Sequence, residues 1–430
     1  MNPVVSYEQL KRQLKLRLAD VLPGEGRAGQ HVHPDRNAVL IQARSALRAL
    51  LDDGRSLHAL SPTEQEQLIA EVLEEIVGLG PLEPLLADPD ISEIMVNGPS
   101  EVFVERGGRL ERIEVQFKGT DHLMAVIERM LGSVNLTVNE ATPLCDASLP
   151  DGSRINVIIP PLALNGPVVT IRRKLRDWTM GEYTALGVLS QQAAEFLEAC
   201  VKAKVNLVIS GGTSTGKTTL VGILASVIPP EHRIITIENV SELELTGRRH
   251  WIRLVTKLAN VENRGEIPLR TLVKNALRMR PDRIILGEAR GGEALDVVQA
   301  MHSGHDGFIT VLHANSPKAA LERLETLMLM SGLDLPPAAC RMQLASAVDL
   351  VIHVARFADG SRRVSAISQV LGISSQQEGF DMEDVFTFEA EGFSTEGALR
   401  GACRYTGAVP KFLAKFRLNN VAIPAWLTPA

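Results

Sequence analysis

The chain has 430 residues, of which 45% are hydrophobic and 22% charged, and this is typical of a globular protein with two or three domains. Its formal net charge of −6 argues against a dedicated nucleic-acid-binding protein, because such proteins usually present a basic face. The longest apolar run, 157–164, is too short to span a bilayer, and the four widely spaced cysteines form no metal-binding pair, so we expect a cytoplasmic protein with reduced thiols.

Three amphipathic helices are predicted near the start of the chain, over 1–22, 37–53 and 62–80. Residues 23–30, between the first two, are rich in glycine, a composition typical of a linker. Residues 1–60 are therefore expected to form a helical, partly flexible extension.

A smaller α+β domain is predicted over 61–174, followed by a connector and hinge over 175–190. The alternation of apolar and polar residues and the positions of glycines carry this prediction. The elements expected in the domain are a hairpin over 102–113, a helix over 120–133, a turn at Asp151–Gly152 and a strand over 167–171.

Residues 191–430 are expected to form a RecA-like α/β domain with a C-terminal subdomain. Short β-branched runs alternate with helical patterns, which predicts a parallel, doubly wound sheet. Its strands are expected over 204–210, 233–238, 283–288 and 307–313, with a later hairpin at Asp359–Gly360 and strands near 364–371 and 385–389.

Residues 211–218 match the phosphate-binding pattern G-x-x-x-x-G-K-[ST], with a predicted strand before them and a predicted helix after them. Glycines at 211 and 216 allow positive φ and close approach of the backbone to a phosphate. Lys217 is expected to reach the β- and γ-phosphates, and the Thr218 hydroxyl to hold Mg²⁺. The residues expected to bind the nucleotide are Gly211, Gly212, Thr213, Ser214, Thr215, Gly216, Lys217, Thr218 and Thr219.

Acidic residues follow two other predicted strands at the edge where open α/β sheets bind ligands. Glu288 is expected to lie near the γ-phosphate and Mg²⁺, and either Glu238 or Glu242 to act as general base. His313, at the end of a third strand, is expected to sense the γ-phosphate.

Several stretches in fixed order resemble the type II/type IV secretion ATPase superfamily, and most closely its Tad/Flp pilus branch, the CpaF/TadA-type assembly motor. These stretches are 86–99, 149–164, 211–218, 272–283 and 311–317, and the resemblance covers about 65–415. It implies a homohexamer that hydrolyses ATP with Mg²⁺ and powers pilus assembly through inner-membrane platform proteins. Membrane contact would come only through these partners, and no direct contact with nucleic acid is implied.

The resemblance also implies roles for individual positions. The acidic box is matched around Glu238–Glu242, the motif ending in a catalytic glutamate by Glu288, and the histidine box by His313. Arg278 and Arg280 match an arginine-bearing helix, and are expected to contact the nucleotide. Arginines of the N-terminal domain are expected near the nucleotide across a domain or subunit boundary, and the candidates are Arg154, Arg172 and Arg173.

The chain departs from the family pattern at Asn239, where aspartate is usual, at Ser214, where glycine is commoner, and over 256–262. Two other functions stay open. One is a conjugation-type secretion ATPase or nucleic-acid translocase, and the other is a nucleotide-gated scaffold that binds ATP without turnover.

Overall fold

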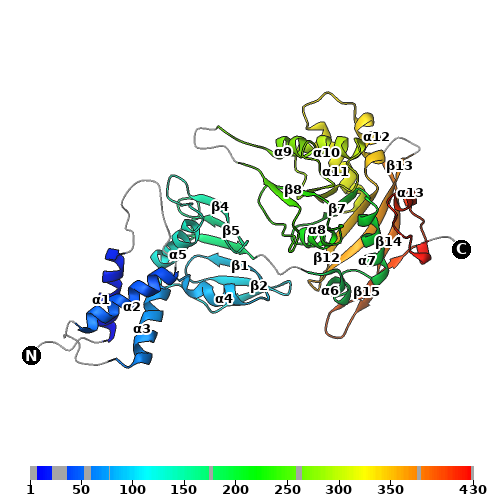
Figure 1. Ribbon diagram of the computed structural model, residues 1–430. Coiled ribbons are helices and arrows are strands. Elements are labelled where there is room, and N and C mark those ends of the chain that lie inside the picture. Colours follow the sequence, from blue (N-terminus) through cyan, green and yellow to red (C-terminus); the bar gives the residue numbers. More distant parts are fainter. Residues whose placement is uncertain are drawn as a thin grey trace, which may run out of the picture. The chain divides into compact units, whose positions relative to one another are not determined.

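The computed structural model describes residues 7–21, 36–52, 60–76, 78–173, 178–257, 264–374 and 379–427. The chain divides into two compact units, Met1–Leu175 (unit 1) and Arg176–Ala430 (unit 2) (Figure 1). The predicted linker at 23–30 lies outside the described residues. None of the described helices has the length and apolar character needed to cross a bilayer.

Unit 1 begins with three helices, α1 (Tyr7–Val21), α2 (Arg36–Asp52) and α3 (Pro62–Ile76). They share one apolar core, to which Leu14, Leu47 and Leu68 contribute one side chain from each helix. Lys11 Nζ also lies 2.6 Å from Glu71 Oε2, which joins α1 to α3. The predicted boundary after residue 60 is therefore wrong, because α3 belongs to the helical segment that precedes the α+β domain.

The α+β part of unit 1 is a six-stranded antiparallel sheet in the order β3-β2-β1-β6-β5-β4. Its elements are η1 (Gly80–Leu82), α4 (Glu83–Ala87), β1 (Ile91–Asn97), β2 (Val102–Arg106), β3 (Arg109–Ile113), α5 (Thr120–Gly132), β4 (Leu144–Ser148), β5 (Arg154–Ile158) and β6 (Val168–Arg172). The apolar side of α5, including Leu123 and Ile127, packs with sheet residues such as Ile94 and Val157. The predicted hairpin, helix and last strand are confirmed, while β1 was not predicted as a strand.

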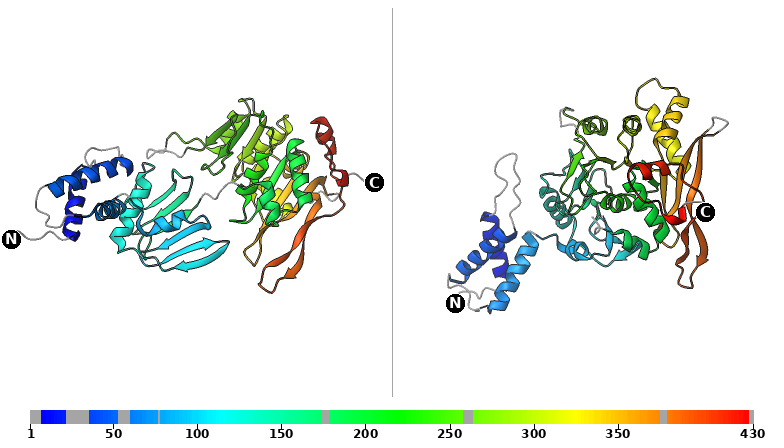
Figure 2. Two further views of the ribbon diagram at one scale, coloured as in Figure 1. Left: turned by 60° about the horizontal axis from the view of Figure 1, so that its bottom comes forward. Right: turned by 45° about the vertical axis from the view of Figure 1, so that its right-hand side comes forward.

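Unit 2 contains a nine-stranded sheet in the order β15-β14-β13-β12-β7-β11-β10-β8-β9. Its strands are β7 (Leu207–Gly211), β8 (Ile234–Glu238), β9 (Trp251–Val255), β10 (Arg283–Leu286), β11 (Ile309–His313), β12 (Leu350–Arg356), β13 (Arg362–Ile373), β14 (Phe380–Phe393) and β15 (Leu399–Tyr405). From β12 to β9 every pair is parallel, whereas β12 to β15 pair antiparallel. Figure 2 shows the β14–β15 hairpin, in orange, extending beyond the helices of the unit.

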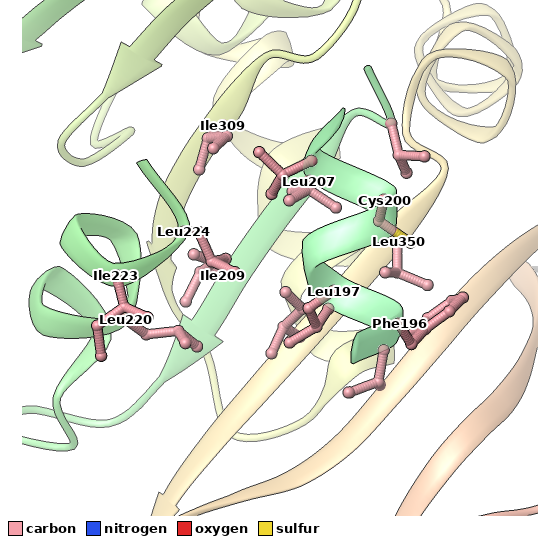
Figure 3. Packing of buried hydrophobic residues seen from close by; sticks show 14 of the residues in the cluster. Phe196, Leu197, Cys200, Leu207, Ile209, Leu220, Ile223, Leu224, Ile309 and Leu350 are labelled. Atoms are coloured by element: carbon pink, nitrogen blue, oxygen red, sulfur yellow. The ribbon is translucent and has the colours of Figure 1, made fainter. Parts of the chain in front are cut away.

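Helices cover both faces of this sheet. They are α6 (Met180–Ala185), α7 (Gln191–Lys202), α8 (Lys217–Ser226), α9 (Leu269–Ala276), α10 (Glu293–His302), α11 (Pro317–Leu329), α12 (Pro337–Ala347) and α13 (Leu413–Leu418), with η2 (Ala425–Leu427) near the end of the described chain. Leu207 and Ile209 of β7 face α7 and α8 (Figure 3), and Val208 between them faces the core of α9 to α12. A strand that is apolar on both faces is what a doubly wound sheet requires, and the predicted fold is confirmed.

Helix α13 is fastened to the edge of the sheet at which the parallel strands begin. Lys415 Nζ lies 2.6 Å from Asp349 Oδ2, and this carboxylate also accepts a hydrogen bond from the backbone N–H of Asn206 at 2.8 Å. Phe412 and Phe416 add their rings to the core that covers β7. This part of the chain therefore belongs to the same packed core as strand β7.

Most of the segment predicted as a hinge, 175–190, is part of unit 2. Residues 178–190 are folded onto unit 2, because Tyr183 of α6 and Leu189 are buried in its core. The rest of the predicted hinge, 175–177, lies outside the described residues.

Candidate nucleotide site

Residues 211–218, which we call the phosphate loop, connect β7 to α8 at the carboxyl edge of the parallel strands. Gly216 has φ +93° and begins α8, a left-handed conformation that suits glycine. At Gly211 a Cβ atom would lie 2.3 Å from the Val354 carbonyl oxygen, so only glycine fits. Ser214 also has a positive φ, +55°, although it is not glycine.

The first residues of α8 direct their polar groups into the loop and the acidic box. Lys217 Nζ donates to the carbonyl oxygens of Gly211, at 3.1 Å, and of Gly212. The Thr218 hydroxyl donates to Glu242 Oε2 at 3.0 Å. The predicted lysine, the predicted Mg²⁺ ligand and one acidic-box residue are therefore brought together.

The two acidic-box glutamates occupy different environments. Glu238, at the end of β8, is buried, and its Oε1 accepts hydrogen bonds from the backbone N–H groups of Glu242 and Leu243, each at 3.0 Å. Burial raises the pKa of Glu238 to about 7, against the opposing effect of these hydrogen bonds. Glu238 thus shapes the acidic segment, whereas Glu242 is the glutamate that touches the phosphate loop.

His313 bridges the phosphate loop and the carboxylate that follows β10. Its Nδ1 lies 3.4 Å from Lys217 Nζ, and its Nε2 lies 3.3 Å from Glu288 Oε1. Because the ammonium group can only donate, Nδ1 accepts and Nε2 carries the proton. Burial first, and then the charge of Lys217, lower the pKa of His313, which favours the neutral ring.

The loop after Glu288 is held by two further charged residues. Arg290 Nη2 lies 2.7 Å from Glu288 Oε2. Glu293, at the start of α10, accepts hydrogen bonds from the backbone N–H groups of Arg290 and Gly291 at 2.6 and 2.8 Å. Arg290 and His313 therefore contact the two oxygens of the Glu288 carboxylate, and Glu293 holds the backbone that follows it.

The predicted arginines of unit 1 have different partners. Arg154 of β5 and Arg172 of β6 lie directly opposite each other, and Glu93 of β1 lies opposite Arg172. The guanidinium group of Arg173 donates instead to the backbone carbonyl oxygens of Asp88 and Ile91. Arg173 therefore contributes to the packing of its own unit through these two hydrogen bonds.

Arg278 and Arg280 were also predicted to contact the nucleotide. They follow α9 and precede β10, so they lie where the parallel strands begin, at the edge opposite the phosphate loop. Both arginines therefore lie away from the phosphate loop of their own chain, because residues that precede a parallel strand lie at the edge where the strand begins.

Sequence reasoning missed four side chains that support the phosphate loop. Ser210 Oγ lies 2.9 Å from His353 Nδ1, both buried, beneath the loop. Arg362 Nε donates to the Ser214 carbonyl oxygen at 2.9 Å, and the Tyr183 hydroxyl lies 3.5 Å from the place that a Cβ on Gly216 would occupy. Ser210 directly precedes the loop, whereas His353, Arg362 and Tyr183 come from distant strands and from the connector, and no local motif marks them.

The arrangement suits a nucleoside triphosphate with Mg²⁺. Gly216 takes a left-handed conformation at the N-terminus of α8, where backbone N–H groups can bind phosphate oxygens. One cationic group, one hydroxyl and the carboxylates of Glu242 and Glu288 surround it. Hydroxyl and carboxylate oxygens are the ligands that Mg²⁺ prefers.

Comparison with known proteins gives one matching family model, described as Type II/IV secretion system protein, over residues 75–395. A candidate conjugal transfer protein of Mycobacterium tuberculosis (strain ATCC 25618 / H37Rv) is 34% identical over 317 residues, 72% of this chain and 89% of the relative. The type IV secretion system protein VirB11 of Brucella suis is 35% identical over 303 residues, 64% of this chain and 84% of that protein.

Among solved structures, the ATPase DotB of Yersinia pseudotuberculosis has a TM-score of 0.51 and 16% identity. The match covers 69% of this chain and 78% of DotB, and at this identity it shows a shared fold.

Proposed function

Because the chain belongs to the type II/type IV secretion ATPase superfamily, we propose that it is a Mg²⁺-dependent ATPase that works as a homohexamer and powers assembly of a Tad/Flp-type pilus. The observation that carries the proposal is the pair of contacts that His313 makes with Lys217 and Glu288. The hydrogen bond from Thr218 to Glu242 lies next to them. The motor would act in the cytoplasm, bound to inner-membrane platform proteins.

Each of these residues would have a distinct role in hydrolysis. Lys217 and the loop N–H groups would bind the β- and γ-phosphates, and Mg²⁺, held through Thr218 and Glu288, would neutralise charge on the phosphate oxygens. Glu242 or Glu288 would accept the proton of the attacking water. His313, neutral and held by Lys217 and Glu288, would detect loss of the γ-phosphate through its contact with Lys217.

Arg154 and Arg172 of unit 1 would supply positive charge to the nucleotide across a domain or subunit boundary, with a gain of about 10³–10⁵ in rate. Closure of unit 1 against unit 2 around ATP would then convert hydrolysis into movement of the platform proteins.

The test is Mg²⁺-dependent ATP turnover and ATP binding of the wild type and Glu288→Gln, with molar mass measured by light scattering. We expect Glu288→Gln to bind ATP but to lose turnover by about 10²–10⁴, because the amide cannot accept the proton. Glu322→Gln, which changes an exposed glutamate of α11, is the matched control and should keep wild-type turnover. Normal turnover in Glu288→Gln would remove Glu288 from this role.

A second candidate is a secretion ATPase of the conjugation type, which the similarity to the mycobacterial protein and to VirB11 favours. It predicts turnover that DNA stimulates, and DNA binding that weakens steeply with added salt. The same assays with and without DNA separate the two candidates. Binding of ATP with no turnover under any condition would instead support a nucleotide-gated scaffold.

A further inference from the structure

Ser214 is the one residue of the phosphate loop that takes a left-handed conformation without being glycine. Its φ of +55° brings Cβ close to the following carbonyl oxygen, which disfavours this conformation for every residue with a side chain. Serine also lacks the local hydrogen-bonding advantage that lets asparagine and aspartate adopt such values more often. Some other contact must therefore stabilise the loop in this shape.

Arg362 supplies that contact. It is the first residue of β13, and its Nε donates to the Ser214 carbonyl oxygen at 2.9 Å. Its Cδ atom lies 3.7 Å from the place that a Cβ on Gly216 would occupy, so the side chain runs along the second half of the loop. A charged donor makes a stronger hydrogen bond to a carbonyl oxygen than a neutral donor does.

The strand that carries Arg362 is itself well anchored. In the turn before β13, the Asp359 carboxylate accepts hydrogen bonds from the backbone N–H groups of Ser361, at 2.9 Å, and Leu399, at 2.7 Å. Arg363, the residue that follows Arg362, donates from Nη1 to the Gly187 carbonyl oxygen at 2.6 Å. The backbone on either side of Arg362 is thus held in place by these hydrogen bonds.

We propose that Arg362 is a positioning residue that keeps the phosphate loop in its binding conformation by holding Ser214 left-handed. This inference rests on the proposed nucleotide-binding function, and it links the antiparallel extension of the sheet to that site. If the contact serves this purpose, a glycine at position 214 should make Arg362 dispensable, because glycine adopts positive φ without a steric penalty.

The experiment compares the full chain with Arg362→Ala, Ser214→Gly and the double variant, using binding of a fluorescent ATP analogue with Mg²⁺ and thermal unfolding of each protein. We expect Arg362→Ala to weaken binding about five- to thirtyfold, because the left-handed conformation of one residue with a side chain is disfavoured by that factor. Ser214→Gly should bind about as well as the wild type, and the double variant should recover to about that level. Arg404→Ala, which removes a guanidinium group paired with Glu389 and Glu391 on the β14–β15 hairpin, is the matched control.

Each outcome decides the question. A double variant as weak as Arg362→Ala would overturn the proposal and indicate that the charge of Arg362 acts on the nucleotide directly. Unchanged binding in Arg362→Ala would overturn it as well, and so would loss of the cooperative unfolding transition, which would assign Arg362 to the stability of the sheet. If the wild type binds no nucleotide while it unfolds cooperatively, the proposed function fails, which is a distinguishable result.

Discussion

Glu238 is a buried carboxyl group whose pKa of about 7 has a direct consequence for stability. An acid with a raised pKa takes up a proton on folding, so the free energy of unfolding should fall as pH rises from about 4.5 to about 7. The full shift is worth roughly 3 kcal/mol at 1.36 kcal/mol per pKa unit.

Glu238→Gln should abolish this pH dependence and stabilise the chain at pH 8, because the amide oxygen still accepts the hydrogen bonds from Glu242 and Leu243 and no charge is buried. Urea unfolding of wild type and variant between pH 5 and 8, without nucleotide or Mg²⁺, measures the effect. Parallel pH profiles for the two proteins would contradict the prediction.

The arginines of unit 1 should separate into two groups by phenotype. Arg173→Ala should destabilise unit 1 by about 1–3 kcal/mol, because it leaves the carbonyl oxygens of Asp88 and Ile91 without this donor. Arg154→Ala and Arg172→Ala should instead lower turnover with little change in stability. Thermal unfolding and ATPase assays on all three variants check this division, and a stable, inactive Arg173→Ala would refute it.

The sequence predicted the parts of the site that depend on local pattern and missed those that depend on long-range contacts. The phosphate loop, Glu288 and His313 each follow a recognisable strand, so their place at one edge could be inferred. Which of Glu238 and Glu242 faces the loop depends on two backbone hydrogen bonds, which no spacing reveals.

At the level of elements, α6 shows how the connector is fastened to unit 2. The helix begins with a capping box, in which the Thr179 hydroxyl accepts from the backbone N–H of Glu182 and the Glu182 carboxylate accepts from the backbone N–H of Thr179. It carries Tyr183, whose hydroxyl group lies 3.5 Å from the place that a Cβ on Gly216 of the phosphate loop would occupy.

Thr179→Ala should destabilise α6 by about 0.5–2 kcal/mol, because it removes the hydroxyl that accepts a hydrogen bond from the backbone N–H of Glu182. Hydrogen exchange of the amides of 180–185 should become faster by a corresponding factor of about 2–30. Thr184→Ala, in the same helix, removes only a bond back to the Gly181 carbonyl oxygen and should have a smaller effect. Equal exchange rates in the two variants would contradict the capping argument.

The elements that the sequence did not predict share a physical cause. Strands β9 and β12 contain the aromatic and β-branched residues that favour strands, but their parallel pairing with β8 and β7 depends on distant segments that local pattern does not reveal. The predicted boundary after residue 60 grouped α3 with the α+β domain, whereas the position of α3 is decided by Leu68 and Val72 packing against α1 and α2.

On the scale of the whole molecule, the three-helix core and the α+β core of unit 1 have no buried residue in common. A chain that begins at residue 78 should therefore keep the fold of the remaining parts and bind Mg²⁺-ATP with an affinity within about twofold of the full chain. Calorimetric titration and thermal unfolding of the shortened chain test this. Loss of ATP binding with intact unfolding would show instead that the helices contribute to the site.

The junction of α13 with Asn206 and Asp349 has a consequence for the order in which the protein is made. A ribosome completes every residue of the phosphate loop long before it reaches Phe412 and Phe416, which cover the apolar face next to β7. Domains generally fold as units during synthesis. We therefore expect a message that stops after β15 to yield a chain that contains the entire site yet is degraded, so that only translation through α13 gives the cell a stably folded protein.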